Sequence, residues 1–200
     1  MRPDRDFMAS MASLESGYLK TDEPEMQSGF SGGRARWIRE RSPLAEAIEW
    51  HGDFLDVGCA NGLLAADVVD WAAGRGYEIT PYGIDIGPRL VSLARDRHSN
   101  MPAHFAVADA WTWEPKRKWD YVYSLVDLAP EELRCEFLSR LASWVAPGGR
   151  LILGSYGSRS RLEDPQDLAG ILANCGFEVA GAASGGIGPI SRFAWTTRLT

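Results

Sequence analysis

Residues 54–62 read Phe-Leu-Asp-Val-Gly-Cys-Ala-Asn-Gly, and this stretch decides the fold. It begins as an apolar strand and ends in a turn of small residues, where the backbone can bend tightly and approach a ligand. An amphipathic helix is predicted over about residues 62–73, because Leu64, Val68 and Trp71 recur on one helical face. A strand, a glycine-containing turn and a helix in this order predict the first unit of a parallel sheet.

The same alternation continues to the end of the chain. Further strands are predicted near 82–85, 105–107, 121–125, 151–153, 177–179 and 193–197. Helices are predicted to begin at Pro88, at Pro130 and at Pro165, where proline suits the first helical position. The pattern therefore predicts an α/β fold with helices on both faces of the sheet.

Composition bounds the class of protein. The chain has 200 residues, of which 45% are hydrophobic, so one globular domain is expected. Lys and Arg number 21 against 27 Asp and Glu, a net charge of −6, and this balance disfavours nucleic acid as a partner. Because no apolar run approaches the ~20 residues of a membrane span, no membrane partner is expected.

The N-terminus starts Met-Arg-Pro-Asp-Arg-Asp and lacks the apolar core of a secretory signal. We therefore expect a cytoplasmic protein in which Cys59, Cys135 and Cys175 are reduced thiols. Residues 1–33 show little apolar periodicity and are expected to be mobile, and Ser42-Pro43 predicts a short helix ahead of the core.

Polar and small residues follow four of the predicted strands. Asp56 and Gly58 close the first, Asp85 closes the second 27 residues after Gly58, and Asp109 follows the third. Ser124 and Leu125 end the fourth. In an open parallel sheet, ligands bind outside the carboxyl ends of the strands, so a site is expected there.

This series, with Pro147-Gly148-Gly149 ahead of the fifth strand, resembles the motifs of class I S-adenosylmethionine-dependent methyltransferases. The resemblance covers about residue 44 to the C-terminus. It implies a single three-layer αβα Rossmann-like domain with a seven-stranded, mostly parallel sheet whose last strand is antiparallel. It also implies S-adenosyl-L-methionine as the cofactor. The chain departs from the pattern at Ala60, where the family has the middle glycine of the turn.

The resemblance also assigns positions for the cofactor. Residues of the turn and of the fourth strand would line its amino acid, methionine and ribose portions: Asp56, Gly58, Cys59, Ala60, Gly62, Ser124 and Leu125. Residues after the second and third strands would hold the ribose diol and the adenine: Asp85, Ile86, Asp109 and Ala110. By resemblance, Asp56 helps to hold the ammonium end.

A small-molecule methyl acceptor is expected, and residues 1–43 are expected to form a flexible segment and lid on a methyltransferase domain over 44–200. A general base, if the acceptor needs one, would come from the rim of the site: Asp127, Glu131, Tyr123 or Tyr156. The three histidines are predicted to lie at the opposite edge of the sheet, and no metal site is expected.

Three other functions remain open. A methyltransferase that acts on RNA or protein would have the same cofactor site, and a noncatalytic module would bind the cofactor without turnover. A nicotinamide-dependent oxidoreductase also uses a glycine-rich turn and a ribose-binding acid. Ala60 and Asp56 disfavour that last class, because a pyrophosphate needs close backbone approach and is itself anionic. A monomer or a homodimer fits the sequence.

Overall fold

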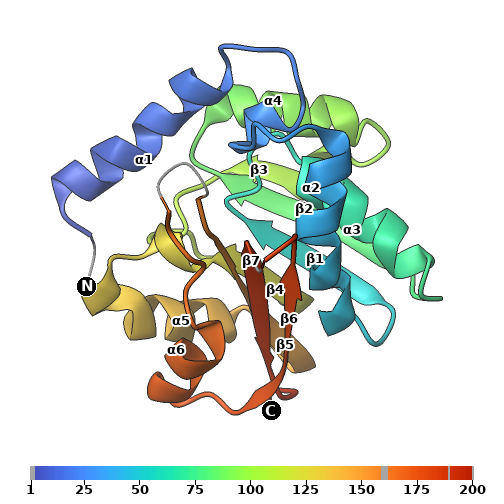
Figure 1. The fold of residues 1–200 in the computed structure, drawn as a ribbon, viewed down its shortest axis with the longest axis vertical. Helices are drawn as coiled ribbons and strands as arrows, with labels where there is room; N and C mark the ends of the chain where they lie inside the picture. Colours follow the sequence, from blue (N-terminus) through green and yellow to red (C-terminus); the bar gives the residue numbers. More distant parts are fainter. Residues whose placement is uncertain (1–2, 159–161, 189, 200) are drawn as a thin grey trace.

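The computed structural model describes residues 3–158, 162–188 and 190–199, and its strands form one seven-stranded sheet of order β3-β2-β1-β4-β5-β7-β6 (Figure 1). The strands are β1 Gly52–Val57, β2 Ile79–Asp85, β3 Phe105–Val107, β4 Trp119–Leu125, β5 Val145–Tyr156, β6 Val179–Gly185 and β7 Ser191–Thr196. The strands β1 to β5 pair in parallel, whereas β7 is antiparallel to both β5 and β6. The predicted α/β fold and sheet are confirmed.

Helices cover both faces of this sheet (Figure 1). They are α1 Arg5–Tyr18, α2 Arg34–Arg41, α3 Leu63–Ala73, α4 Pro88–Arg97, α5 Arg134–Ser143 and α6 Leu168–Asn174, with 3₁₀ turns η1 Met26–Ser28, η2 Ser42–Ala47, η3 Pro102–His104, η4 Val126–Leu128 and η5 Glu131–Leu133. Side chains alternate along β1: Phe54 packs in the cluster that holds α2 and α3 residues, and Leu55 and Val57 pack in the cluster under α5 and α6. Asp56 lies on the same face of the sheet as Phe54.

The N-terminal residues are helical where a mobile start was expected. Asp4 caps α1 by accepting the N–H of Phe7 at 2.8 Å, yet no residue within α1 is buried. Phe7, Met11, Leu14 and Tyr18 recur at helical spacing along α1, so a signal for this helix was present in the sequence and was missed. The short helix predicted at Ser42-Pro43 is the 3₁₀ turn η2, and α2 precedes it.

Several predicted boundaries shift. The helix expected at Pro130 begins as α5 at Arg134, after η5. The helix expected at Pro165 begins at Leu168, where Asp167 caps it by accepting the N–H of Gly170 at 3.1 Å. Strand β6 extends through small residues to Gly185 that read as a connection in the sequence.

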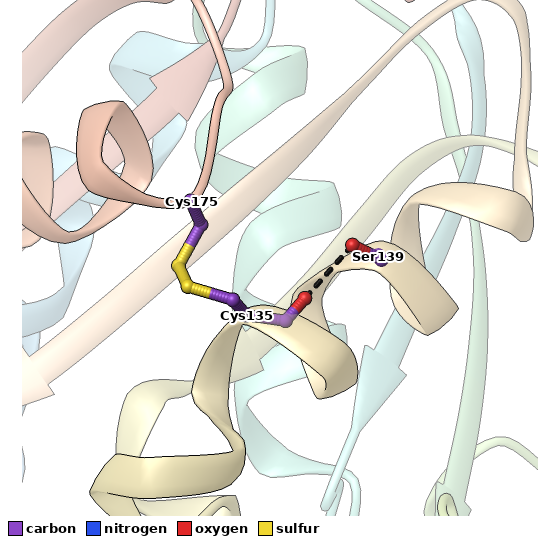
Figure 2. The surroundings of a disulfide bond; sticks show 3 residues. All are labelled: Cys135, Ser139 and Cys175. Carbon is purple, nitrogen blue, oxygen red and sulfur yellow. Dashed lines mark hydrogen bonds between the residues drawn. A yellow bond between two sulfur atoms is a disulfide. The ribbon is translucent and has the colours of Figure 1, made fainter.

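A disulfide joins Cys135 of α5 to Cys175 at the C-terminal end of α6 (Figure 2). The expectation of reduced thiols was wrong for these two residues and is confirmed for Cys59, which is free and buried. The two cysteines are 40 residues apart in sequence, and only the packing of α5 and α6 on one face brings them together. No helix in the described part of the chain has the length and apolar character that crossing a membrane requires.

Candidate active site

The turn after β1 depends on left-handed backbone conformations. Gly58 has φ +85°, Ala60 has φ +45° and Gly62 has φ +71°. The N–H groups of Gly58 and Cys59 both donate to the Ile84 carbonyl, at 2.8 and 3.0 Å, which fastens the turn to β2. Ala60 thus adopts the conformation that a glycine would take, at a cost of about 1–2 kcal/mol.

Asp85 at the end of β2 is bonded directly to this turn. Its Oδ2 accepts the N–H of Ala60 at 2.9 Å, and its Oδ1 accepts the N–H of Gly87 at 2.8 Å. Burial raises the pKa of the Asp85 carboxyl, and these backbone donors oppose that rise. Each carboxylate oxygen keeps a further lone pair, so the group can still accept hydrogen bonds from a ligand.

Glycine at position 83 makes room for this arrangement. A Cβ there would lie 2.7 Å from both the Cys59 Sγ and the Phe105 ring. The buried thiol therefore fills space beside β2, and burial raises its pKa well above the usual value. Cys59 is a packed thiol of the turn rather than an exposed nucleophile.

Asp56 is a buried carboxyl on the wall of the site. It is 2% exposed, and its Cα is the register partner of Gly83 in β2 and of Tyr123 in β4. Desolvation, with the nearby Asp85 charge, raises the pKa of Asp56 to about 8. Within the residues that the structure describes, its oxygens have no hydrogen-bond or ion-pair partner, and they are not fully enclosed but face the cavity. The chemistry of such a group favours a cationic ligand.

A cavity opens in front of Asp56 and the glycine turn. Its lining includes seven of the residues predicted from sequence: Asp56, Gly58, Cys59, Ala60, Tyr123, Leu125 and Tyr156. It also includes five residues outside the candidate site residues named from the sequence: Ser28, Trp37, Arg41, Val57 and Leu64. Two elements missed from the sequence, η1 and α2, supply three of these five side chains. A signal for two of them exists in the four-residue spacing of Trp37 and Arg41, which puts both on one face of a helix.

The remaining predicted residues lie outside this cavity. Asp109 follows β3 beside Asp85, because the N–H of Ala108 donates to the Asp85 carbonyl at 2.9 Å. The Asp109 Oδ1 accepts the N–H of Trp111 at 2.9 Å, and the Ala110 carbonyl accepts from Arg140. The other two cofactor positions at strand ends are Ile86, which is half-buried, and Ser124, which is buried with its hydroxyl on the Leu125 carbonyl.

Among the four candidate bases, Asp127 and Glu131 are exposed and do not line the cavity. Asp127 accepts a hydrogen bond from Gln166 at 2.8 Å. The hydroxyls of Tyr123 and Tyr156 lie 3.1 Å apart on the cavity wall. Burial raises the pKa of both phenols, so at neutral pH they act as hydrogen-bond donors more readily than as bases.

The N-terminal segment is fastened to the glycine turn through Asn61. The hydroxyl of Ser28 donates to Asn61 Oδ1 at 2.6 Å, and Asn61 Nδ2 donates to the Pro24 carbonyl at 2.9 Å. Asn61 Nδ2 also donates to Gln27 Oε1 at 3.2 Å. Asn61 is fully buried, so the turn and residues 24–28 form one packed unit.

Asp67 of α3 holds α2 in place. Its two oxygens accept from both terminal nitrogens of Arg34, at 2.6 and 2.5 Å, and Oδ2 also accepts the indole N–H of Trp37 at 2.6 Å. The bidentate pair fixes orientation as well as distance. Trp37 is thereby held at the cavity wall.

The C-terminal end of helix α1 lies beside α4 (Figure 1). The Glu15 Oε1 accepts the N–H of Arg89 at 2.7 Å at the N-terminus of α4. Tyr18 is half-buried, and burial together with the Asp85 charge raises the pKa of its phenol. Residues of the first helix therefore approach the carboxylate at the end of β2.

Two residues at the C-terminal end of α4, Arg97 and the capping residue His98, support the glycine turn from behind. Arg97 donates to the Asn61 carbonyl, and the His98 ring lies 3.0 Å from the Gly62 carbonyl. His98 is buried and stacks on Phe105. The prediction that it lies at the opposite edge of the sheet was wrong, because the C-terminal end of α4 packs against the turn.

Comparisons with known proteins agree with this geometry. Residues 54–149 match the family model described as a methyltransferase domain. The chain is 21% identical over 159 residues to malonyl-[acyl-carrier protein] O-methyltransferase 1 of Ilyobacter polytropus, covering 74% of this chain and 58% of that protein. It is 34% identical over 97 residues to trans-aconitate 2-methyltransferase of Methylobacterium radiotolerans, covering 48% of this chain and 35% of that protein. The chain thus spans less than two thirds of either relative.

Solved structures show the same fold. The N-methyltransferase NodS from Bradyrhizobium japonicum WM9, in complex with S-adenosyl-L-homocysteine, superposes with a TM-score of 0.71 at 15% identity, covering 95% of this chain and 99% of that chain. Magnesium protoporphyrin IX methyltransferase from Synechocystis PCC 6803, with bound S-adenosylmethionine, gives 0.66 at 18% identity, with both chains fully covered.

Proposed function

We propose that the chain is a class I S-adenosylmethionine-dependent methyltransferase that transfers the methyl group of S-adenosyl-L-methionine to a small organic molecule, as its methyltransferase domain match and fold support. The observation that carries this proposal is Asp56, a buried carboxyl without a partner in the described residues, on a cavity beside a glycine turn. The ammonium group of the cofactor's amino acid end is the partner that such a carboxyl lacks.

The residues present fit this cofactor. Asp56 would hold the ammonium group, and the backbone of Gly58 and Ala60 would lie against the amino acid and ribose portions. Asp85, already oriented by two backbone donors, would accept the ribose hydroxyls. Asp109 would lie against the adenine, next to Asp85 at the neighbouring strand end.

When bound, S-adenosylmethionine would supply an electrophilic methyl group on its sulfonium: an electron pair of the acceptor would form the new bond to the methyl carbon, and the electron pair of the carbon–sulfur bond would stay on sulfur. The protein's contribution is orientation and exclusion of water. Trp37, Leu64 and Leu125 supply apolar cavity wall, and Trp37 is fixed there by Asp67. An acceptor that must lose a proton would release it to solvent or to one of the candidate bases.

We propose that the N-terminal segment, residues 1–43, is the lid of the site. Residues 24–28 are bonded to the turn through Asn61, and α2 is bonded to α3 through Asp67. These contacts support α2 and η1 as fixed walls. Helix α1 has no buried residue and is bonded to α4 through Glu15, so in this proposal it is the part of the lid that opens as the cofactor enters. Residues 1 and 2 of this segment lie outside the described residues.

The alternatives have less support. The net charge of −6 disfavours RNA, whose phosphates are bound through clustered Lys and Arg. The names of the relatives, with malonyl and trans-aconitate acceptors, favour an organic acceptor. Cytoplasmic location and a monomer or homodimer are kept as proposals, although the Cys135–Cys175 disulfide is unusual in a reducing compartment.

A thermal-shift panel tests the proposed function. S-adenosylmethionine and S-adenosylhomocysteine are expected to raise the melting temperature, because a ligand that binds the folded state stabilises it. NAD and NADP are expected to leave it unchanged. A rise in melting temperature with NAD and none with S-adenosylhomocysteine would contradict the proposed methyltransferase and favour an oxidoreductase. Product formation from a panel of acceptors separates an enzyme from a noncatalytic module.

A further inference from the structure

Arg41, the last residue of α2, places a buried positive charge on the cavity wall. Its residue exposure is 4%. The guanidinium carbon lies 3.8 Å from the ring centroid of Tyr156, 4.2 Å from that of Phe30 and 4.6 Å from that of Trp37. Three aromatic rings therefore hold the cation in one position, and cation–π attraction partly offsets its desolvation.

The charge of Arg41 is poorly neutralised. Its Nη1 lies 3.4 Å from Glu40 Oε2, whereas the other oxygen of Glu40 forms a closer pair, at 2.6 Å, with Arg36. The Nε of Arg41 is buried and has no hydrogen-bond partner in the described ranges 3–158, 162–188 and 190–199. A buried guanidinium with an unused donor favours an anionic ligand.

The two tyrosines beside Arg41 add a further donor. Their hydroxyls lie 3.1 Å apart, so one proton lies between the two oxygens and the other remains for a ligand. Burial raises the pKa of both phenols, which keeps them protonated at neutral pH. Arg41, Tyr123 and Tyr156 thus offer two kinds of donor on one wall of the cavity.

This group of donors extends from the cofactor residues toward β5: Tyr123 on β4 is the register partner of Asp56, and Tyr156 lies one strand further away. Tyr156 is the last residue of β5, and β4 separates β5 from β1. Two strand spacings amount to roughly 10 Å across the sheet. The cofactor residues Asp56, Asp85 and Asp109 lie at or after the ends of β1, β2 and β3, so the cation faces the part of the cavity left for the acceptor.

On the basis of the proposed function, we propose that Arg41, Tyr123 and Tyr156 bind a carboxylate group of the methyl acceptor, which is therefore an organic acid. The planar fork of a guanidinium matches a carboxylate, and a tyrosine hydroxyl completes its hydrogen bonds. The two charged residues of the cavity then have separate partners: Asp56 pairs with the cofactor's ammonium group, and Arg41 pairs with the acceptor's carboxylate.

Direct binding tests this proposal without requiring turnover. Short aliphatic mono- and dicarboxylates, with their amides and methyl esters as matched controls, are titrated into wild-type protein with and without S-adenosylhomocysteine. Fluorescence of the tryptophans, including Trp37 beside Arg41, reports binding. Carboxylates are expected to bind roughly 10- to 100-fold more tightly than the neutral analogues. Equal affinities in both titrations would overturn the proposal even if S-adenosylhomocysteine binds normally.

Variants locate the binding group. Arg41→Met is expected to remove the preference for carboxylates, Arg41→Lys to retain part of it, and Tyr156→Phe to weaken it. Arg39→Gln, an exposed arginine of the same helix, is the control and should change nothing. S-adenosylhomocysteine affinity is measured for each variant, and it should stay at the wild-type value and so report an intact fold. If Arg41→Lys lowers the affinity for S-adenosylhomocysteine as much as the affinity for the titrated carboxylates, Arg41 holds the cofactor's own carboxylate and the proposal is wrong.

Discussion

The backbone N–H of Ala60 donates to Oδ2 of Asp85 across 2.9 Å, which couples the turn after β1 to the end of β2. Asp85→Ala removes this bond and the acceptor for a ribose diol. Because a hydrogen bond to a charged group contributes about 1.5–3 kcal/mol, S-adenosylhomocysteine affinity should fall roughly 10- to 100-fold. Calorimetry on the folded variant measures this, and wild-type affinity would remove Asp85 from the site.

Asp56 should make the protein less stable as pH rises. Its pKa is about 8 when folded and near 4 when unfolded, so between these values the folded state holds more protons. The free energy of unfolding then falls with pH across this window, by at most about 1.4 kcal/mol per pH unit from this group, and levels off above pH 8. Asp56→Asn should remove this dependence.

The melting temperature of Asp56→Asn is therefore expected to exceed that of wild type at pH 8 and to approach it near pH 4, in the absence of cofactor. Asp96→Asn, on the exposed side of α4, is the matched control. A difference in melting temperature between Asp56→Asn and wild type that stays constant from pH 4 to pH 8 would show that the buried carboxyl does not hold its proton.

Gly58→Ala should be more damaging than Gly76→Ala, although both glycines have a left-handed backbone. The new Cβ would lie 2.8 Å from Leu128 Cδ1, in addition to the strain of φ +85°. Gly76 has φ +89° and no atom within 4 Å of the added Cβ, so Gly76→Ala isolates the backbone strain, about 1–2 kcal/mol. Urea unfolding should show a larger loss for Gly58→Ala, and only that variant should lose S-adenosylhomocysteine binding.

Reduction of the Cys135–Cys175 disulfide should lower stability without altering the site. It closes a loop of 40 residues, for which chain entropy gives a stabilisation of about 4 kcal/mol. The melting temperature should fall by roughly 10 °C in reductant. The Cys135→Ser/Cys175→Ser variant should melt like reduced wild type in either buffer. Three titratable thiols in denatured protein without reductant would show that the bond does not form.

Deleting residues 1–20 tests the lid. Since no residue of α1 is buried, the melting temperature should change little. Loss of Glu15 and Tyr18 beside Asp85 should lower the affinity for S-adenosylhomocysteine roughly 10-fold. Glu15→Gln, which removes only the charge at the start of α4, should have a smaller effect. Full affinity in the deletion variant would limit the lid to η1 and α2.

The sheet could be predicted because each strand is apolar and each turn is marked by glycine or proline, as around Gly58 and Pro88. The acidic strand ends could be predicted because topology alone brings Asp56 and Asp85 together. Helix α2 could not, since its sequence is mostly charged and its order depends on the distant Asp67. The spacing of Arg41 and Trp37 places both on one helical face, but only tertiary packing brings that face to the cavity.

The disulfide and the stacking of His98 behind the turn escaped prediction for a related reason. The disulfide depends on the packing of α5 beside α6, and the His98 stack depends on the packing of α4 against β3, and neither leaves a pattern in the chain. The expected reduced state of Cys135 and Cys175 came from the absence of a secretory signal, which is evidence on location and not on geometry.

Calorimetric titration of wild-type protein with S-adenosylhomocysteine, at pH 7 in two buffers of different ionisation enthalpy, tests the cofactor site most directly. Asp56 is protonated in the free protein and ionises when it pairs with the ligand's ammonium group, so binding should release about one proton. Asp56→Asn should bind weakly and release none. Absence of binding to wild-type protein, or binding that Asp56→Asn leaves unchanged, would contradict the account.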